Sequence, residues 1–296
     1  MDIVYTYVNM NDTNWNTKRQ MMKQLYYDPN INNIDSNTEN RFIDNNELLL
    51  SIRSVEKFVS WVNKIYIVTD EHFPEWLNIN HEKIIVIDHK NIIPNEFLPT
   101  FNSHVIELFL HKIPGLSETF IYLNDDVIFT KNIQYEDFVN NNKISVFLDK
   151  YYTKKGNPNV NEYAFRSAWK NSNKWLDEYF FVEKRYKMAH APMIINKTIV
   201  NNIWDIMYDK LIPVCNQKFR SIIDYNILCS IYIYYSLYKG FAFNNDTLKC
   251  ISIFDNDDLS KIYNKDCHII CLNTYSKNIF EYIQNVFLFE KSDFEI

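Results

Sequence analysis

Glycine is scarce in this chain, with only three among 296 residues. This scarcity excludes a Gly-rich phosphate-binding loop, a dinucleotide-binding fingerprint and collagen-like sequence, because each needs several closely spaced glycines. The Gly-x-Ser-x-Gly pattern of a nucleophile elbow is absent as well. A phosphorylated ligand would therefore have to be held by other means, such as a metal ion or placed cations.

Clustered positive charge is also lacking. The net charge is −6, and Lys and Arg form no long runs, so the electrostatic footprint of a nucleic-acid-binding protein is missing. The start of the chain does not resemble a signal peptide, and the apolar run at 227–238 is too short to span a bilayer. We expect a cytoplasmic protein without a transmembrane segment and without a nucleic-acid partner.

Cysteines are few, odd in number and confined to the last third of the chain. Cys267 and Cys271 are separated by three residues, but no second pair follows at the spacing of a zinc site, so buried free thiols are the expectation. Hydrophobic residues make up 47% of the chain and aromatic residues 16%. That composition predicts a globular protein with a large core and leaves room for an oligomeric interface.

Short apolar runs alternate with amphipathic stretches in the first half of the chain. Strands are expected at 2–8, 64–69, 83–87 and 119–123, and helices at 45–59 and 103–113. Asp44 with Glu47 would form the capping box of the first helix, and Ser103 would cap the second. Strands that alternate with helices predict an α/β fold with a mostly parallel, doubly wound sheet.

The rest of the chain is less regular. Residues 10–40 and 140–162 are expected to be loops, and helices are expected at 162–187, 196–210, 219–238 and 277–290, with short strands at 249–254 and 267–272. We expect one domain over 1–296, in which an α/β half, 1–138, and a mainly helical half, 139–296, together form the functional site.

Polar residues follow the predicted strands, where parallel sheets bind ligands. Asn9 follows the first strand, Asp70 the second, and Asn124, Asp125 and Asp126 the fourth. Adjacent carboxylates suit a hard cation such as Mg²⁺ or Mn²⁺. The alternative is a simple turn, since Asn and Asp favour turns.

Isolated residues carry weaker signals. His104 and His190 are lone histidines, which are more often structural than catalytic. Arg220 and Asp224 have the i, i+4 spacing of a surface ion pair on a helix, although an arginine at the start of a buried helix could also neutralise a phosphate.

Several blocks together resemble the motif regions of the Stealth family of hexose-1-phosphate transferases. They are DIVYTYVNMND, RFIDNNELLLSIRSVEKFVSWVNKIYIVTD, LPTFNSHVIELFLHKIPGLSETFIYLNDDVIF, and a later HAP followed by FRSIID. That family includes bacterial capsular polysaccharide phosphotransferases and the catalytic part of animal N-acetylglucosamine-1-phosphotransferase. The resemblance implies transfer of a sugar-1-phosphate from a UDP-sugar to an acceptor sugar hydroxyl, with release of UMP.

The resemblance also implies roles for individual residues. Asp126, His190 and Arg220 would be catalytic, and Asp125 and Asp126 would hold a divalent cation, Mg²⁺ or Mn²⁺. The substrates would be bound by Tyr5, Thr6, Val8, Asn9, Asp44, Asn45, Glu47, Arg53, Asp70, Asn102, Ser103, His104, Asn124, Asp224 and Asn273.

The chain departs from the family pattern at three positions. Tyr7 stands where the family usually has Trp, Met10 where it has Gly, and Thr274 where it has an acidic residue. Two alternatives therefore stay open: a conventional metal-dependent glycosyltransferase that releases UDP, and an inactive relative that binds carbohydrate or nucleotide.

Overall fold

The computed structural model describes the whole chain except residues 255–261, 263–265, 274–275 and 288. Its central sheet has the strand order β10-β4-β1-β2-β3. These strands are β1 (Asp2–Thr6), β2 (Ile65–Thr69), β3 (Ile84–Asp88), β4 (Thr119–Leu123) and β10 (Met193–Asn196). All neighbours are parallel except β10 and β4, which are antiparallel. The predicted α/β fold with a mostly parallel sheet is confirmed.

Smaller sheets extend this core. A three-stranded sheet joins β5 (Val127–Phe129) to β13 (Ile269–Leu272) and β12 (Cys250–Ile253). A second contains β6 (Val139–Asn140), β7 (Lys143–Val146) and β11 (Ala242–Asn244), and β8 (Leu148–Tyr152) pairs with β9 (Tyr186–Met188) as a ribbon. The two short strands expected near the end of the chain exist, and β12 pairs with β13, which in turn pairs with β5.

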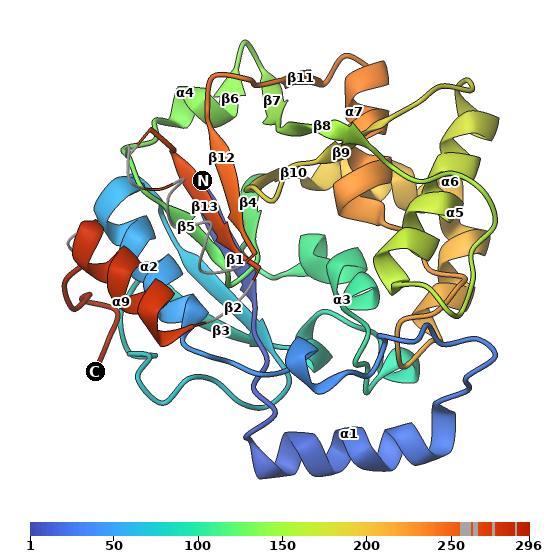
Figure 1. Cartoon of the computed structure of the whole chain (residues 1–296), viewed down its shortest axis with the longest axis horizontal. Helices are drawn as coiled ribbons and strands as arrows, with labels where there is room; N and C mark the ends of the chain where they lie inside the picture. The colour runs from blue at the N-terminus through green and yellow to red at the C-terminus, as the bar shows by residue number, and fades with distance from the viewer. Residues whose placement is uncertain (255–261, 263–265, 274–275, 288) are drawn as a thin grey trace.

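Helices gather on either side of the central sheet (Figure 1). On one side lie α2 (Glu47–Phe58) and α9 (Lys277–Val286), and on the other α5 (Ala164–Tyr179), α6 (Lys197–Cys215) and α7 (Ile233–Tyr238). The remaining α-helices are α1 (Thr13–Tyr26), α3 (Ser103–Phe109) and α4 (Tyr135–Phe138). No helix in the described ranges has the length and apolar character needed to cross a membrane.

Two expected loops contain regular structure. Residues 10–40 include the α1 helix, which starts where Asp12 accepts a hydrogen bond from the Trp15 backbone N–H at 2.7 Å. It buries only Trp15, Arg19 and Met22, so its apolar periodicity is weak in the sequence. Residues 140–162 likewise include β7 and all of β8. Neither strand alternates between buried and exposed residues, because β7 is buried from Ile144 to Val146 and β8 is exposed at its end.

The expected helix at 219–238 starts later than predicted. Residues 219–226 form a turn, a π-helical segment spans Ile227–Tyr232, and α7 follows it. The Asp224 carboxylate accepts hydrogen bonds from the Ser221 backbone N–H at 3.1 Å and from its hydroxyl at 2.7 Å. Such local bonds compete with helix formation, so Arg220 and Asp224 do not share a helix. The helix expected at 162–187 likewise ends early, at Tyr179.

The predicted helix caps were also wrong. Asn46, at a positive φ of 67°, precedes α2, and the Glu47 carboxylate accepts the Asn45 backbone N–H at 2.6 Å. Asp44 instead accepts hydrogen bonds from the Asn46 backbone N–H and the Tyr7 hydroxyl, both at 2.8 Å. For α3 the cap is Asn102, whose side chain accepts the His104 N–H. Asp44 and Glu47 therefore do not form the predicted capping box of α2.

Candidate active site

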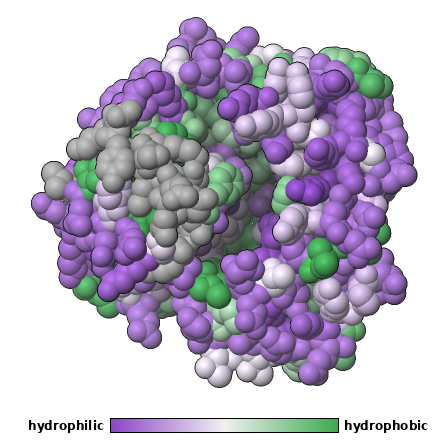
Figure 2. Space-filling view, viewed as in Figure 1, coloured by the Kyte–Doolittle hydropathy of each residue, from purple (hydrophilic) through white to green (hydrophobic). Residues whose placement is uncertain are grey.

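The carboxyl ends of the central strands lie together because the strands pair in parallel. Tyr5 in β1 is opposite Leu123 in β4, so the turn at 124–126 lies beside the end of β1. Figure 2 shows a hollow near the middle of the viewed face of the molecule. In the same view, α2 and α9 lie on one side of this hollow, and α5 and α6 lie on the other. The polar residues predicted at the strand ends lie at this edge of the sheet.

Four carboxylates crowd the end of β4. Burial raises the pKa of Asp125 well above its ordinary value, and the charges of Asp126, Glu47 and Asp44 raise it further. Burial also raises the pKa of Asp126, to about 6. The start of α2 supplies Glu47, and α2 is fixed here because the Ser51 hydroxyl bonds to both the Tyr5 hydroxyl and the Val127 carbonyl. This acidic cluster concentrates negative charge in a partly buried position.

Asp126 is held by a residue far away in the sequence. The Cys271 thiol donates a hydrogen bond to Asp126 Oδ2 at 3.1 Å, and His190 Nδ1 lies 3.5 Å from the same sulfur. Burial and the Asp126 charge raise the pKa of Cys271 well above its ordinary value, so the thiol stays protonated and can donate. Among the residues that the structure describes, Asp126 Oδ1 is buried without a hydrogen-bond partner.

A cationic cluster lies at the start of α3. The Arg220 guanidinium donates to the Ser103 hydroxyl, and Arg41 is close enough that the Arg220 charge, after burial, helps to lower the pKa of Arg41 to about 9. Arg41 also forms an ion pair with Asp35 at 2.9 Å. Two neighbouring guanidinium groups, both half-buried, form a suitable environment for a phosphate.

A buried network supports these arginines. Asp224 Oδ2 accepts a hydrogen bond from Asn102 Nδ2 at 2.9 Å and lies 2.9 Å from His104 Nδ1. Burial, followed by the Arg220 charge, lowers the pKa of His104 to about 4. His104 is therefore neutral at neutral pH, and with Asn102 and Asp224 it orients the turn that carries Arg220.

One further acid lies between the two clusters. Burial raises the pKa of Glu107 to about 7, and the Arg220 charge opposes this rise. After burial, Glu107 and, more weakly, Asp125 both raise the pKa of Tyr122, whose hydroxyl lies 3.1 Å from the Thr6 hydroxyl. Glu107 and Tyr122 therefore couple electrostatically to both charged clusters.

The end of β2 is stabilised differently. Asp70 is ion-paired with Lys18 of α1 at 3.0 Å, and the Asn9 backbone N–H donates to His72 Nε2 at 2.9 Å. The Tyr7 hydroxyl donates to Asp44, and its ring lies 5.6 Å from that of His72. Tyr7 therefore connects this group to the acidic cluster.

Other predicted residues are placed as follows. Arg53 is bound bidentately to Glu295, away from the acidic cluster, with both bonds at 2.7 Å. Val8 packs at the edge of the aromatic group around Trp15, Asn124 is exposed, and Asn273 Nδ2 lies 3.4 Å from the Cys271 sulfur. Thr274 falls outside the described residues.

Sequence reasoning missed Cys271, Glu107 and Arg41 as contributors to the site. Cys271 was expected to be an inert buried thiol. The available signals were slight: Arg41 stands beside the predicted helix start, and Glu107 lies in the predicted helix that begins with Ser103. Cys271 had none, because it reaches Asp126 only through the pairing of β13 with β5.

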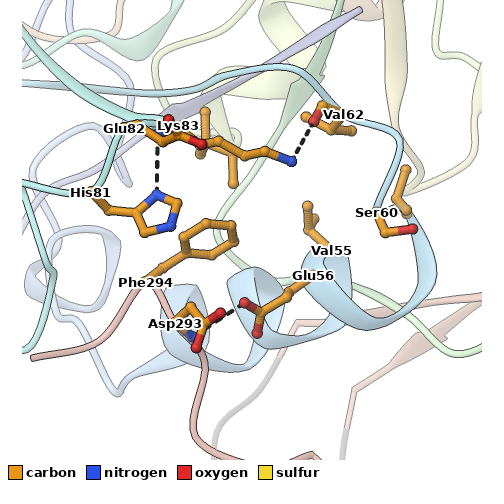
Figure 3. Close-up of a pocket in the computed structure, with 11 residues that line it drawn as sticks. Val55, Glu56, Ser60, Val62, His81, Glu82, Lys83, Asp293 and Phe294 are labelled. Atoms are coloured by element: carbon orange, nitrogen blue, oxygen red, sulfur yellow. Dashed lines mark hydrogen bonds between the residues drawn. The ribbon is translucent and has the colours of Figure 1, made fainter.

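A separate cavity of about 200 Å³ lies between α2, residues 81–83 and the last residues of the chain (Figure 3). His81 packs edge-on against Phe294, and Lys83 Nζ reaches the Val62 carbonyl. It contains none of the predicted site residues, so it is distinct from the candidate active site.

Comparisons with known proteins show close relatives. A family model described as Stealth protein CR2, conserved region 2, matches residues 41–147. The capsular polysaccharide phosphotransferase LcbA of Neisseria meningitidis is 31% identical, with 100% of this chain and 84% of LcbA covered. The capsular polysaccharide phosphotransferase cps12A of Actinobacillus pleuropneumoniae is 32% identical, with 94% and 77% covered.

A third relative is longer. The capsular polysaccharide phosphotransferase fcs1 of Haemophilus influenzae is 36% identical over 80% of this chain but over 65% of its own length, so the chain spans slightly less than two thirds of that protein. Among solved structures, the galactosyltransferase LgtC aligns over 97% of this chain and 94% of its own, with 11% identity and a TM-score of 0.47.

Proposed function

Because the chain belongs to the Stealth family, we propose that it transfers a sugar-1-phosphate from a UDP-sugar to a hydroxyl of an acceptor sugar or glycan and releases UMP. An N-acetylhexosamine is the donor sugar we favour, and the acceptor belongs to a surface polysaccharide or glycan. The proposal is supported by the names of the relatives, which are capsular polysaccharide phosphotransferases. It also includes a cytoplasmic location.

One observation carries the proposal. Glu107 interacts electrostatically with Arg220 of the cationic cluster and with Tyr122, and Tyr122 interacts in the same way with Asp125 of the acidic cluster. A nucleotide sugar carries two phosphates that need cations, whereas its acceptor carries a hydroxyl that must lose a proton. Opposite charges within one partly buried site meet both needs.

Phosphoryl transfer needs alignment, charge neutralisation and a proton acceptor. In the proposed reaction, the acceptor oxygen forms a bond to the β-phosphorus and the bond from that phosphorus to the UMP oxygen breaks. Arg220, with Arg41 beside it, offsets the charge on the phosphoryl oxygens. The sugar C1–O bond stays intact, so the anomeric configuration is retained.

His190 is the group we favour as the proton acceptor. The His190 side chain is exposed, but the surrounding protein atoms partly desolvate the ring and lower its pKa, so the imidazole is neutral at neutral pH and can take a proton. Its Nδ1 lies 3.5 Å from the Cys271 sulfur, which places the ring near Asp126. Asp126 is the alternative acceptor.

The acidic cluster also fits a divalent cation. No group of three or more His, Cys, Asp or Glu side chains suited to a metal occurs among the residues that the structure describes. Asp125 and Asp126 still provide hard oxygen donors, and Asp126 Oδ1 has no hydrogen-bond partner within the described ranges of the chain. Mg²⁺ or Mn²⁺ commonly uses one or two carboxylates together with substrate phosphates, and when bound it would neutralise phosphate charge.

The leaving nucleotide tests the proposal. The enzyme is incubated with UDP-N-acetylglucosamine and other UDP-sugars, with an acceptor glycan and with Mg²⁺ or Mn²⁺, and the nucleotide product is separated by chromatography. UMP is expected. UDP would identify a conventional glycosyltransferase that breaks the C1–O bond, and the absence of turnover with every donor would indicate an inactive binding protein.

Two variants test the assigned residues. His190→Ala and Arg220→Ala are each expected to reduce UMP release by about 10²- to 10⁴-fold, the range typical of a lost acid–base or charge-stabilising group. Lys210→Ala, in an exposed part of α6, is the control and should retain full activity. Wild-type rates in both site variants would refute these roles.

A further inference from the structure

Trp15, in the first turn of α1, is the centre of an aromatic group next to the cationic cluster. Its ring lies 5.4 Å from that of Phe42 and meets that of Phe101 edge-on at 5.3 Å. Phe101 in turn stacks on Phe219 at 5.5 Å, with an interplanar angle of 15°. No more than 6% of any of these four residues is exposed. Buried rings in such edge-on and stacked arrangements fix one another's positions.

Each of the other three rings belongs to a segment that carries a residue of the cationic cluster. The pairs in the sequence are Phe42 with Arg41, Phe219 with Arg220, and Phe101 with Ser103, which lies two residues further on. The backbone joins two of these segments as well, because the Phe101 N–H donates to the Lys218 carbonyl at 2.8 Å. The packing of the rings therefore sets the position of the backbone from which both guanidinium groups extend.

The two guanidinium groups repel each other. Burial lowers the pKa of Arg41 to about 9, and the charge of Arg220 adds more to this shift than the attraction of Asp35 takes away. Arg220 donates to the neutral hydroxyl of Ser103. Glu107 also interacts with Arg220, but burial raises its pKa to about 7, so it carries only part of a charge at neutral pH. The repulsion between these like charges has to be opposed by the packing around them.

The α1 helix is anchored by its charged side chains. Lys18 forms ion pairs with the two acids that follow β2, at 3.0 Å each. The Arg19 guanidinium lies 4.3 Å from the Phe42 ring and donates to the Asn37 carbonyl at 2.9 Å. In Figure 1, α1 runs along one edge of the molecule, below α3. The Trp15 ring therefore projects from a helix that is fixed to the rest of the domain.

We propose that Trp15 is a positioning residue that holds Arg41 and Arg220 at the separation at which both contact the β-phosphate of the donor. The inference rests on the proposed function, in which these two arginines offset the charge on the phosphoryl oxygens. In this role Trp15 acts through the three phenylalanine rings and not by contact with the donor. The α1 helix is then part of the phosphate site, although it supplies none of the groups that touch phosphate.

Trp15 has a second neighbour, which offers a different route to the site. Its ring lies 6.0 Å from that of His72, and His72 accepts the Asn9 backbone N–H beyond the end of β1. An effect that ran through His72 and Asn9 would not depend on the β-phosphate and would weaken the binding of UMP and UDP alike. Loss of support for the arginines would instead weaken the binding of UDP alone.

The experiment measures the dissociation constants of UDP and UMP by titration calorimetry at one fixed Mg²⁺ concentration. The two nucleotides differ only in the β-phosphate, so the ratio of their affinities reports the contacts of that phosphate. The wild-type protein should bind UDP more tightly than UMP. Trp15→Leu should reduce this ratio by about tenfold, the effect of losing a charge-assisted hydrogen bond, and should leave the UMP affinity within about twofold of the wild type. Trp15→Phe keeps an aromatic ring and should retain most of the ratio.

A second buried tryptophan provides the matched control. Trp175 of α5 is 5% exposed and stacks on Tyr179 at 4.7 Å, outside the aromatic group around Trp15, so Trp175→Leu should lower stability but keep the ratio. When Arg220→Ala has already reduced the ratio, adding Trp15→Leu should reduce it no further, because both changes act on the same contact. Phe219→Leu removes a ring without changing α1 and should reduce the ratio as Trp15→Leu does. It tests the inference even if Trp15→Leu does not fold.

Several results would overturn the inference. They are an equal loss of UMP and UDP binding in Trp15→Leu, an unchanged ratio in Phe219→Leu, an equal loss of the ratio in the Trp175→Leu control, and additive losses in the double variant. Equal affinity of the wild-type protein for UDP and UMP would overturn it as well. These measurements need no turnover, so the inference can fail although UMP is released, and it can hold although UDP is released. Urea midpoints show which variants are folded.

Discussion

Asp126 depends on a thiol that sequence patterns do not reveal. Cys271 donates to one oxygen of its carboxylate, and the other oxygen has no partner in the part of the chain that the structure describes. The raised pKa of Cys271 keeps the proton on sulfur, so the thiol acts as a fixed donor rather than as a nucleophile. In this arrangement Cys271 is a positioning residue, because it orients Asp126 without contacting substrate in the proposed mechanism.

Cys271→Ala is expected to lower kcat for UMP release by about 10- to 100-fold, the effect of losing one hydrogen bond to a charged group. Cys271→Ser keeps a donor and should restore most of the rate, whereas a purely structural role would make Ser as harmful as Ala in a buried site. The measurement compares kcat and the donor KM of the three proteins. Equal losses in both variants would contradict the positioning role.

Two charged residues of the α2 helix have different roles. Its first residue, Glu47, adds charge to the acidic cluster, whereas Arg53, further along the helix, binds Glu295 near the end of the chain. The side chains of Arg53 and Glu295 are only 12% and 8% exposed. This pair therefore joins α2 to the C-terminal segment, and we expect it to serve stability rather than donor binding.

Glu295→Gln should lower the free energy of unfolding by about 2 kcal/mol, because it leaves the Arg53 charge partly buried and poorly compensated. The urea midpoint should fall accordingly, while the KM for the UDP-sugar stays unchanged. Glu281→Gln changes an exposed acid of α9 and is the control for stability. A raised donor KM in Glu295→Gln without a loss of stability would instead support the role that the resemblance implied for Arg53.

At the scale of the whole molecule, buried titratable groups make stability depend on pH. Burial lowers the pKa of His89 and His104 to about 4 and that of His111 to about 3. Each histidine takes up a proton more readily when the chain is unfolded, so its contribution to stability is complete above about pH 6.5 and is lost as the pH falls toward the folded value. Glu107, with its pKa raised to about 7, acts in the opposite direction.

His111→Leu removes one of these buried bases. The difference in urea midpoint between this variant and the wild type should therefore shift in favour of the variant as the pH falls from 7 to 4.5. Glu107→Gln should show the opposite trend and gain on the wild type as the pH rises from 4.5 to 7. Stability curves for His111→Leu and the wild type that stay parallel over this range would contradict the assignment.

The order of apolar and amphipathic segments along the chain was enough to predict the central sheet and the edge at which polar residues gather. Alternating strands and helices predict parallel pairing, and parallel pairing places the residues after β1, β2 and β4 at one edge. The same sequence patterns did not predict α1 or the turn at 219–226. The apolar periodicity of α1 is too weak to predict a helix. At 219–226, hydrogen bonds from the backbone to the Asp224 side chain replace the helix that the apolar residues suggested.

The residues that meet at that edge from distant parts of the chain can be identified from the tertiary structure but not from local sequence patterns. Cys271 reaches Asp126 across 145 positions, and Arg220 reaches Ser103 across 117. Such contacts follow from the pairing of β13 with β5 and from the turn that Asp224 stabilises. Local patterns report the period of burial along one segment. They do not indicate which segments pack together. In this protein, the packing of distant segments brings the hydrogen-bond partners to both charged clusters.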